Sequence, residues 1–245
     1  MIDWLRADRQ APSVVVGGRK LPIAIRRHAR ARRLTMRLAP DGSEVRITLP
    51  QWGRTLDALV FAETRAEWIA AQLHAVPEAA PVMPGGAVLY RGENLSIFWD
   101  RTRPRLPLLV GEALSCGGPE AAVAARVQSW LEGEAVRLLL QDLGFYCDRA
   151  GEALPALRLS RAQRRWGSCS SSARNHVRVI RINWRLVMAP DFVRRSVVAH
   201  EVAHLTHFDH SPAFHVLLGR LFEHDLGEAD GWLREHGRRL YTAFG

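Results

Sequence analysis

The sequence has 245 residues, 47% of them hydrophobic, and a formal net charge of +9. This length suits one large domain or two small ones, and the absence of any apolar run of about 18 residues argues against a membrane protein. The first residues lack the apolar core of a signal peptide, so we expect a cytoplasmic protein. Three scattered cysteines without a Cys-x-x-Cys pair also fit a reducing compartment: Cys116, Cys147 and Cys169.

The excess of positive charge suits an anionic partner. Lys20 is the only lysine among the 34 Lys and Arg residues, and this bias fits genome composition as well as selection for a binding face. Association with nucleic acid through an arginine-rich surface therefore stays open as a partner hypothesis.

The N-terminal region is expected to be rich in β-strands. Alternating apolar residues and the turn pairs Gly17-Gly18 and Asp41-Gly42 predict a small antiparallel sheet, with strands at 14–16, 21–25, 34–38 and 45–49. A basic cluster interrupts the alternation, and a solvated strand face or loop is favoured over a nucleic-acid patch for its members: Arg26, Arg27, Arg30, Arg32 and Arg33.

One helix at about 55–74 is expected next, with Trp68 in its buried stripe. Strands at 88–90, 95–99 and 106–110 follow. The segment Cys-Gly-Gly-Pro at 116–119 has linker composition, so we predict a β-rich N-terminal region at 13–116 and a second domain at 119–245.

The second domain begins with a predicted long helix from 120 to about 143, with Gly144 as its end. A strand from 157, a turn at Gly167 and the following serines, and a strand at 177–182 come next. This hairpin could offer its edge to an extended peptide or simply cover the next helix. Pro190 and Asp191 open that helix, with Asp191 as a possible cap, and further helices are expected near 211–221 and 229–239.

The stretch HEVAHLTHFDH at 200–210 carries the strongest chemical signal. On a helix that advances about 100° per residue, His200 and His204 lie about 40° apart, one turn above the other. Glu201 lies one step around the helix, where it could hold a water without binding the metal. This is the arrangement of zinc hydrolases, and the alternative is a buried helix with ordinary core histidines.

The third ligand has to come from beyond the helix. We expect His210, because Asp209 favours a local turn and Ser211-Pro212 reads as the start of a new helix. His207 would rotate away from the metal if the helix continued, and His215 falls inside the next helix. The spacing equals that of the metzincin signature, but histidine replaces its glycine at position 207, which argues against a true metzincin.

Three segments together resemble the YgjP-like family of predicted metallopeptidases, relatives of the SprT-like and WLM zinc proteases: RWGSC at 165–169, NWRL at 183–186 and HEVAHLTHFDHSPAF at 200–214. The resemblance covers most of the chain, with a longer hairpin between Cys169 and Asn183 than expected. It implies an α+β fold with a zincin-like metallohydrolase core after the β-rich region. It also implies Zn²⁺ at His200, His204 and His210, with Glu201 as general base.

The expected function is hydrolysis of peptide bonds in a protein or peptide substrate. Two rivals are a zinc hydrolase of a non-peptide amide and a basic DNA-associated protein with a structural zinc. Supporting roles are hypothesised for several residues: oxyanion support by His207, His215 or Tyr241, and ligand orientation by Asp209, Asn183 or Glu223. Cys169 is interpreted as a packed turn residue rather than a ligand.

Overall fold

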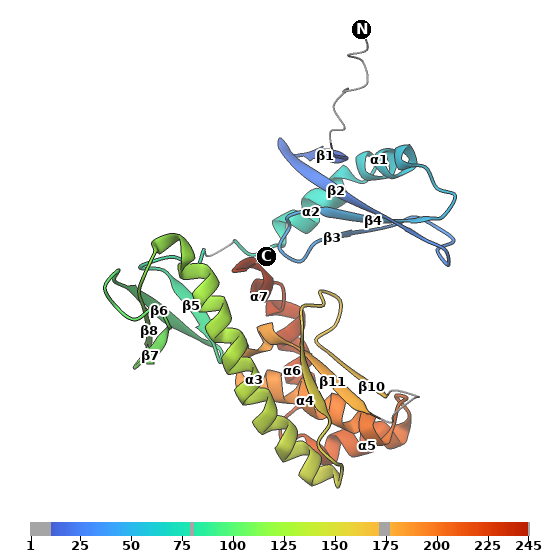
Figure 1. Cartoon of the computed structure of the whole chain (residues 1–245). Helices are drawn as coiled ribbons and strands as arrows, with labels where there is room; N and C mark the ends of the chain where they lie inside the picture. Colours follow the sequence, from blue (N-terminus) through green and yellow to red (C-terminus); the bar gives the residue numbers. More distant parts are fainter. Residues whose placement is uncertain (1–10, 79–80, 172–176, 245) are drawn as a thin grey trace. The chain divides into compact units, whose positions relative to one another are not determined.

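The computed structural model describes residues 11–78, 81–171 and 177–244, which form two compact units divided near residue 78 (Figure 1). The expected mixture of helices and several small sheets is confirmed. Sequence analysis predicted the domain boundary at 116–119, which lies within the second of these units. Gly117 is glycine for a different reason, because a Cβ at this position would overlap the backbone of Arg103. Residues on both sides of it share one core, which contains Leu114, Cys116 and Val123.

The N-terminal unit is a four-stranded sheet in the order β1-β2-β4-β3, covered on one face by two helices. Its elements are β1 (Ser13–Val16), β2 (Arg19–His28), β3 (Thr35–Leu38), β4 (Val45–Pro50), α1 (Thr55–Glu63) and α2 (Ala66–His74). The expectation of an antiparallel sheet is wrong for one pair, because β2 and β4 run parallel and β3 takes the edge. Alternate residues such as Leu21, Ile47 and Leu49 point at the helices and are fully buried.

The single helix expected at 55–74 is two helices. The first ends at Glu63 and is followed by Thr64, whose hydroxyl donates to the carbonyl of Phe61, and Arg65 leaves helical geometry with φ −112° and ψ 17°. The break changes the direction in which the second helix presents its side chains. Ile69 is buried as expected, whereas Trp68 is 40% exposed, so its assignment to the core is wrong.

The C-terminal unit begins with a second four-stranded sheet, β5-β6-β8-β7, made of β5 (Ala87–Tyr90), β6 (Glu93–Trp99), β7 (Leu108–Val110) and β8 (Ala113–Cys116). The short turn η2 (Glu120–Ala122) leads into the long helix α3 (Val123–Ala150). The helix continues through Gly144, which was the expected end, and stops at Gly151 in the left-handed conformation. Left-handed glycine is a common helix terminator because it has no Cβ to clash.

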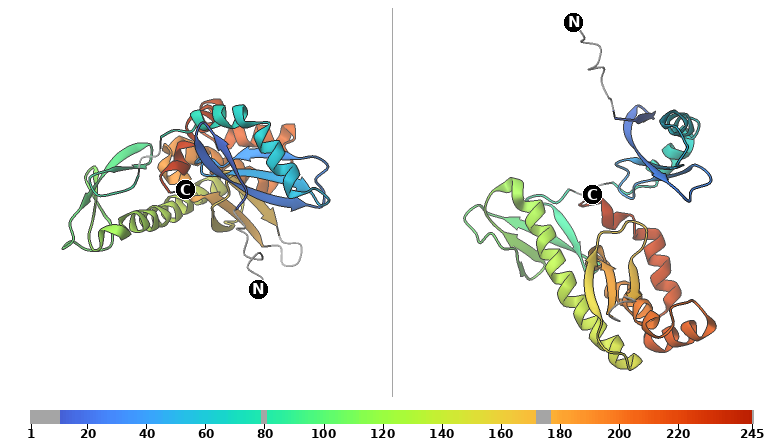
Figure 2. Two further views of the ribbon diagram at one scale, coloured as in Figure 1. Left: turned by 90° about the horizontal axis from the view of Figure 1, so that it is seen from above. Right: turned by 45° about the vertical axis from the view of Figure 1, so that its right-hand side comes forward.

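A third sheet, β10-β11-β9, lies beside the remaining helices (Figures 1 and 2). It consists of β9 (Ala156–Ser160), β10 (Gly167–Ser171) and β11 (Arg178–Asn183), and η3 (Trp184–Met188) follows. The turn predicted at Gly167 is wrong, since Gly167 opens the edge strand β10; the tip of the hairpin at 172–176 falls outside the described residues. The helices are α4 (Asp191–Thr206), α5 (Pro212–Leu221), α6 (Leu226–His236) and α7 (Arg239–Thr242).

Helix α4 is the centre of this unit, as its nearly continuous apolar surface predicts. It contacts α3, α5, α6, β10 and β11, and Val193, Val198 and Val202 are fully buried. No helix in the described ranges is long and apolar enough to cross a membrane.

Candidate metal centre

Three imidazole rings converge at the C-terminal end of α4. His200 and His204 stand one turn apart on the helix, and His210 reaches the same point from the following turn. The Nε2 atom of His200 lies 3.2 Å from that of His204 and 3.3 Å from that of His210. Two nitrogens bound to one tetrahedral Zn²⁺ at about 2.0–2.1 Å lie about 3.3–3.4 Å apart, so these spacings fit a common ion.

The chemistry of the rings also fits a metal. The Nδ1 atom of His204 lies 2.9 Å from the carbonyl oxygen of His207, so the ring donates there and leaves its Nε2 lone pair for a ligand. Burial, followed by the neighbouring histidines, lowers the pKa of His200 to about 4. A neutral imidazole is the form that binds metal ions.

Glu201 lies beside the three rings and is 5% exposed. Its carboxylate accepts a hydrogen bond from the backbone N–H of Cys169, while its Oε2 atom has no hydrogen-bond partner among the described residues. Burial raises the pKa of Glu201 to about 7, against the opposing effect of the Arg165 charge. A buried carboxylate oxygen without a partner is costly and has capacity for one more donor, such as a water.

Strand β10 shapes the place that Glu201 occupies. A Cβ on Gly167 would overlap the Glu201 carboxylate, so any other residue at this position would force the carboxylate to move. In an antiparallel ladder, successive residues direct their N–H groups alternately to the two sides. Because the N–H of Cys169 points to Glu201, the open edge of β10 faces the candidate site.

Phe214, from the first half of α5, packs against all three histidines. Its ring centroid lies 5.0 Å from that of His200, 4.6 Å from that of His204 and 4.9 Å from that of His210, and the side chain is fully buried. It therefore restricts the rings to the converging orientation. Sequence reasoning assigned no role to Phe214, although it is the last residue of the segment at 200–214 that resembles the YgjP-like family.

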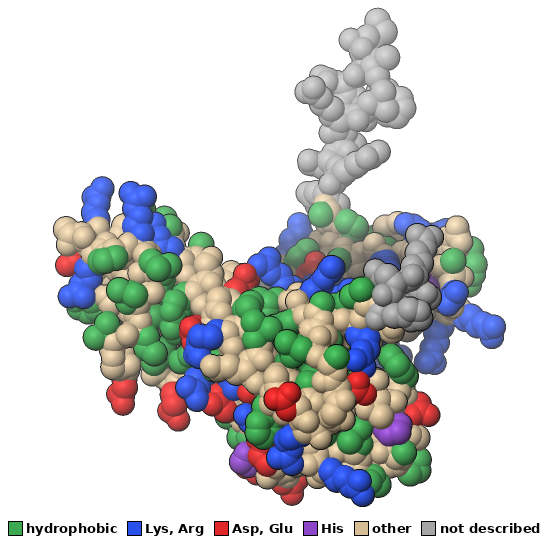
Figure 3. Space-filling view, turned by 60° about the horizontal axis from the view of Figure 1, so that its bottom comes forward, with side chains coloured by type: hydrophobic (Ala, Val, Ile, Leu, Met, Phe, Trp, Pro, Cys, Tyr) green, Lys and Arg blue, Asp and Glu red, His purple; other side chains and the backbone are tan. Residues whose placement is uncertain are grey.

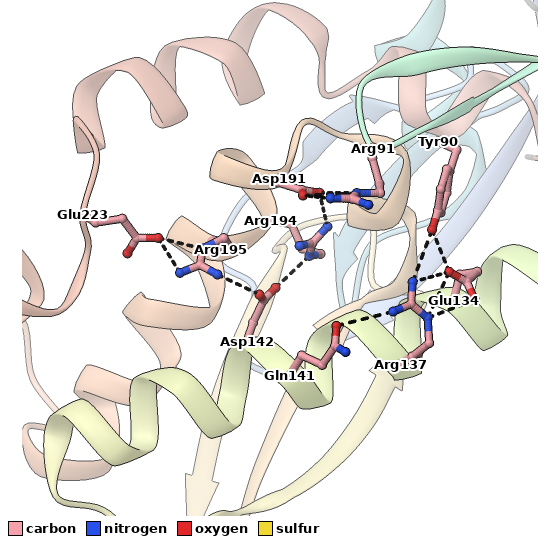
Figure 4. A network of polar contacts seen from close by, with 10 residues as sticks. All are labelled: Tyr90, Arg91, Glu134, Arg137, Gln141, Asp142, Asp191, Arg194, Arg195 and Glu223. Carbon is pink, nitrogen blue, oxygen red and sulfur yellow. Dashed lines mark hydrogen bonds and ion pairs between the residues drawn. The ribbon is translucent and has the colours of Figure 1, made fainter. Parts of the chain in front are cut away.

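A polar network holds the N-terminal half of α4 against α3 and the loop at Arg91 (Figure 4). Arg194, 3% exposed, donates to Asp142 at 2.7 Å and to Asp191 at 2.6 Å, and Arg91 also pairs with Asp191. Asp191 is thus the first residue of the helix and an ion-pair partner, whereas Pro190 holds the cap position. Arg195 continues the network from Asp142 to Glu223 (Figure 4).

A pocket of about 480 Å³ opens next to His200 and Glu201. Helices α4, α5 and α6 and the start of β10 form its walls, which are mainly apolar: Trp166, Val197, Phe214, Leu218, Leu226 and Leu233. Arg165, Asp230 and His215 add charge and polarity at its wall. A volume in the range of about 300–1,000 Å³ is typical of sites that accept small molecules or side chains.

The supporting residues proposed from sequence fall into two groups. His215 lines the pocket, with its ring 6.5 Å from that of His210, and His207 contributes its carbonyl to His204. Cys169 packs beside Glu201, burial raises the pKa of its thiol to about 11, and among the described residues it does not join the cluster of the three imidazoles.

The others are engaged elsewhere. Asn183 donates to the hydroxyl of Tyr241 and to the carbonyl of Ala162, and the Tyr241 hydroxyl bonds to the same carbonyl. Glu223 accepts from Tyr146 and Arg195. The pKa of Asp209 is lowered by bonds from Ser211, which places Asp209 in the turn before α5. None of these contacts involves the three imidazoles.

A mixed α+β unit that gathers three histidines and a buried glutamate at one pocket has the features of a metallohydrolase. The family model "YgjP-like, metallopeptidase domain" matches residues 32–236, and the chain therefore belongs to the YgjP-like family. No curated protein and no solved structure matches the chain.

Proposed function

We propose that the chain is a zinc-dependent peptidase with a zincin-like core, in which His200, His204 and His210 hold Zn²⁺ and Glu201 is the general base. The observation that carries the proposal is the unpartnered Oε2 of Glu201 beside three converging Nε2 atoms. A structural zinc is closed by four protein ligands, whereas no fourth His, Cys, Asp or Glu among the described residues joins this cluster.

When bound, Zn²⁺ supplies a Lewis acid that polarises a carbonyl and lowers the pKa of water. Glu201 receives a proton from the attacking water through Oε2 and passes it to the leaving amine. The hydrogen bond from Cys169 and the contact with Gly167 keep the carboxylate in this orientation. Burial by Phe214 holds the histidine rings in place throughout.

The open edge of β10 supports a peptide as the substrate. An unpaired strand edge binds main-chain N–H and C=O groups of an extended segment regardless of its sequence. The apolar pocket formed by Leu218, Leu226 and Leu233 would then accept one side chain of that segment. Both features favour an extended protein or peptide over a small non-peptide amide.

The test is metal analysis combined with cleavage of an unstructured protein and of a mixed peptide library. The wild-type chain should retain about one zinc per molecule, and His200→Ala should lose it. Glu201→Gln should retain zinc and lose hydrolysis, because the amide cannot accept a proton.

Arg161→Gln is the control variant, since the Arg161 side chain is 69% exposed and its ion pair is with Glu132, away from the three imidazoles. Absence of bound zinc in the wild type after reconstitution would refute the metal site. Normal turnover by Glu201→Gln would remove this residue from the mechanism, and cleavage of small amides but not peptides would favour the non-peptide rival.

A further inference from the structure

The N-terminal unit carries a basic surface that the metal centre does not use. Between residues 11 and 78 the sequence has eleven Lys and Arg residues against six Asp and Glu residues. On the C-terminal unit, positively and negatively charged side chains are interspersed, as Figure 3 shows for one face. The smaller unit therefore has an excess of positive charge that its own fold does not neutralise.

Most of these cations have no acidic partner among the residues that the structure describes. Only two arginines of the unit form ion pairs with carboxylates within the described residues, Arg46 with Glu44 and Arg54 with Asp57. Six exposed arginines form none there: Arg26, Arg30, Arg32, Arg33, Arg37 and Arg65. Guanidinium groups bind phosphate oxygens in a two-pronged geometry, so an unpaired set of them favours a phosphate-bearing partner.

The strand register places part of this set on the solvent face of the sheet. Arg37 of β3 lies opposite Arg46 of β4, and Arg26 of β2 lies opposite Thr48 of β4. The neighbouring residues of these strands, such as Met36 and Ile47, point to the helices on the other face. The arginines are thus displayed on the face that no helix of this unit covers.

An aromatic pocket lies at the edge of the same sheet. Its volume is about 250 Å³, and its lining combines Trp68, Phe61, Leu34 and Met36 with Thr35 and two of the unpaired arginines, Arg33 and Arg65. Trp68 is 40% exposed, although the next residue of the same helix, Ile69, is fully buried. The pocket is smaller than the roughly 300–1,000 Å³ of sites that enclose a whole small molecule, which suits one flat ring.

From this juxtaposition we infer that the N-terminal unit binds single-stranded nucleic acid, with a base against Trp68, two phosphates on Arg33 and Arg65 beside it, and a third, beyond the edge strand β3, on Arg37 of the open sheet face. Stacking requires a base that is free of its own duplex, so a single strand fits better than a double helix. An acidic peptide could satisfy the charges but has no flat ring for the pocket. The inference is independent of the metal centre.

The experiment measures fluorescence anisotropy of a labelled single-stranded oligonucleotide of about 16 nucleotides with the full chain. Three phosphate contacts give a slope of about −2 in log affinity against log salt, so binding should weaken about twentyfold between 50 and 200 mM salt. Arg33→Gln/Arg65→Gln should weaken binding and reduce this slope by about 1.4. Arg101→Gln/Arg105→Gln, which removes the same charge from exposed turns of the other unit, should change affinity less than about twofold.

Trp68→Leu tests the stacking separately. It should weaken binding about 5- to 150-fold with an unchanged salt slope, whereas Trp52→Leu, which alters an exposed tryptophan outside the pocket, should not. Circular dichroism establishes whether each variant is folded. If Trp68→Leu unfolds, Arg33→Gln/Arg65→Gln still tests the inference, because both arginines are exposed. No binding at 50 mM salt, equal loss in the Arg101/Arg105 control, or equally tight binding of a polyglutamate peptide would overturn the inference.

Discussion

The ion pair between Asp142 of α3 and Arg194 of α4 is a buried connection that holds helix α4, and Asp142→Asn tests its contribution to stability. The two side chains are 5% and 3% exposed and 2.7 Å apart. The substitution keeps the shape of the side chain and removes only its charge. Arg194 then stays buried with Asp191 as its remaining carboxylate partner, at 2.6 Å.

Removing one member of a buried pair costs about 3–5 kcal/mol, because the other charge is left without compensation. Since Asp191 still neutralises part of the Arg194 charge, we expect a loss near 3 kcal/mol in the free energy of unfolding. For a unit of this size each kcal/mol lowers Tm by about 2–4 °C, so Tm should fall by about 6–12 °C. Wild type and variant are compared by thermal and urea unfolding at one fixed metal concentration, because bound metal itself shifts stability.

Two further variants are compared with Asp142→Asn for their loss in the free energy of unfolding. Arg161→Gln breaks a pair in which Arg161 is 69% exposed and should cost no more than about 1 kcal/mol. Asp142→Leu/Arg194→Met replaces the buried charges with apolar groups and should be more stable than Asp142→Asn, since no buried charge remains uncompensated. A loss below about 1 kcal/mol in Asp142→Asn would refute the view that this pair anchors α4.

Two further predictions concern the surroundings of the site. Gly167→Ala should retain zinc but reduce kcat/KM about a hundredfold, because the added Cβ displaces the Glu201 carboxylate. The control Gly133→Ala adds its Cβ in open space and should leave kcat/KM unchanged. Equal activity of the two variants would contradict the role of Gly167 in positioning Glu201. The hydrogen bond from Arg178, at 2.5 Å, lowers the pKa of Glu152 below its ordinary 4.5. The stability that this ion pair contributes is therefore fully present above pH 4.5 and is lost as the pH falls through the lowered pKa. Arg178→Gln should therefore cost about 1 kcal/mol near pH 7, and urea unfolding should show this difference shrinking in acid; a difference independent of pH would exclude the linkage.

The sequence alone predicts the part of the site that depends on local geometry. The separation of four residues places His200 and His204 on one helix face without any tertiary information. Asp209 and the Ser211-Pro212 pair also predict the turn that delivers His210, and α5 begins at Pro212. The apolar residues of α4 indicate a buried helix, and Val198 and Val202 are fully buried.

The remaining features arise from contacts between distant segments. A glycine can mark either a flexible turn or a place where something leaves no room for a Cβ, and the two look identical in a sequence. Gly167 was assigned to a turn, yet it lies in a strand against Glu201, and Gly117 was assigned to a linker, yet it packs on the backbone of Arg103. The exposure of Trp68 could not be predicted either. Its position fits the apolar stripe of one continuous helix, but the break at Arg65 turns its side chain towards solvent.

The turn after α4 links the orientation of the His204 ring to the position of His210. His207 leaves helical geometry with φ −124° and ψ 107°, which turns its carbonyl toward Nδ1 of His204. The same bond that orients the His204 ring therefore stabilises the start of the turn that brings His210 back to the site. This explains why histidine is acceptable where the metzincin pattern has glycine, since the backbone of residue 207 has negative φ and its carbonyl does the orienting. The position of His210 is thus set by a main-chain bond between His204 and its own turn, which an i,i+4 pattern cannot reveal.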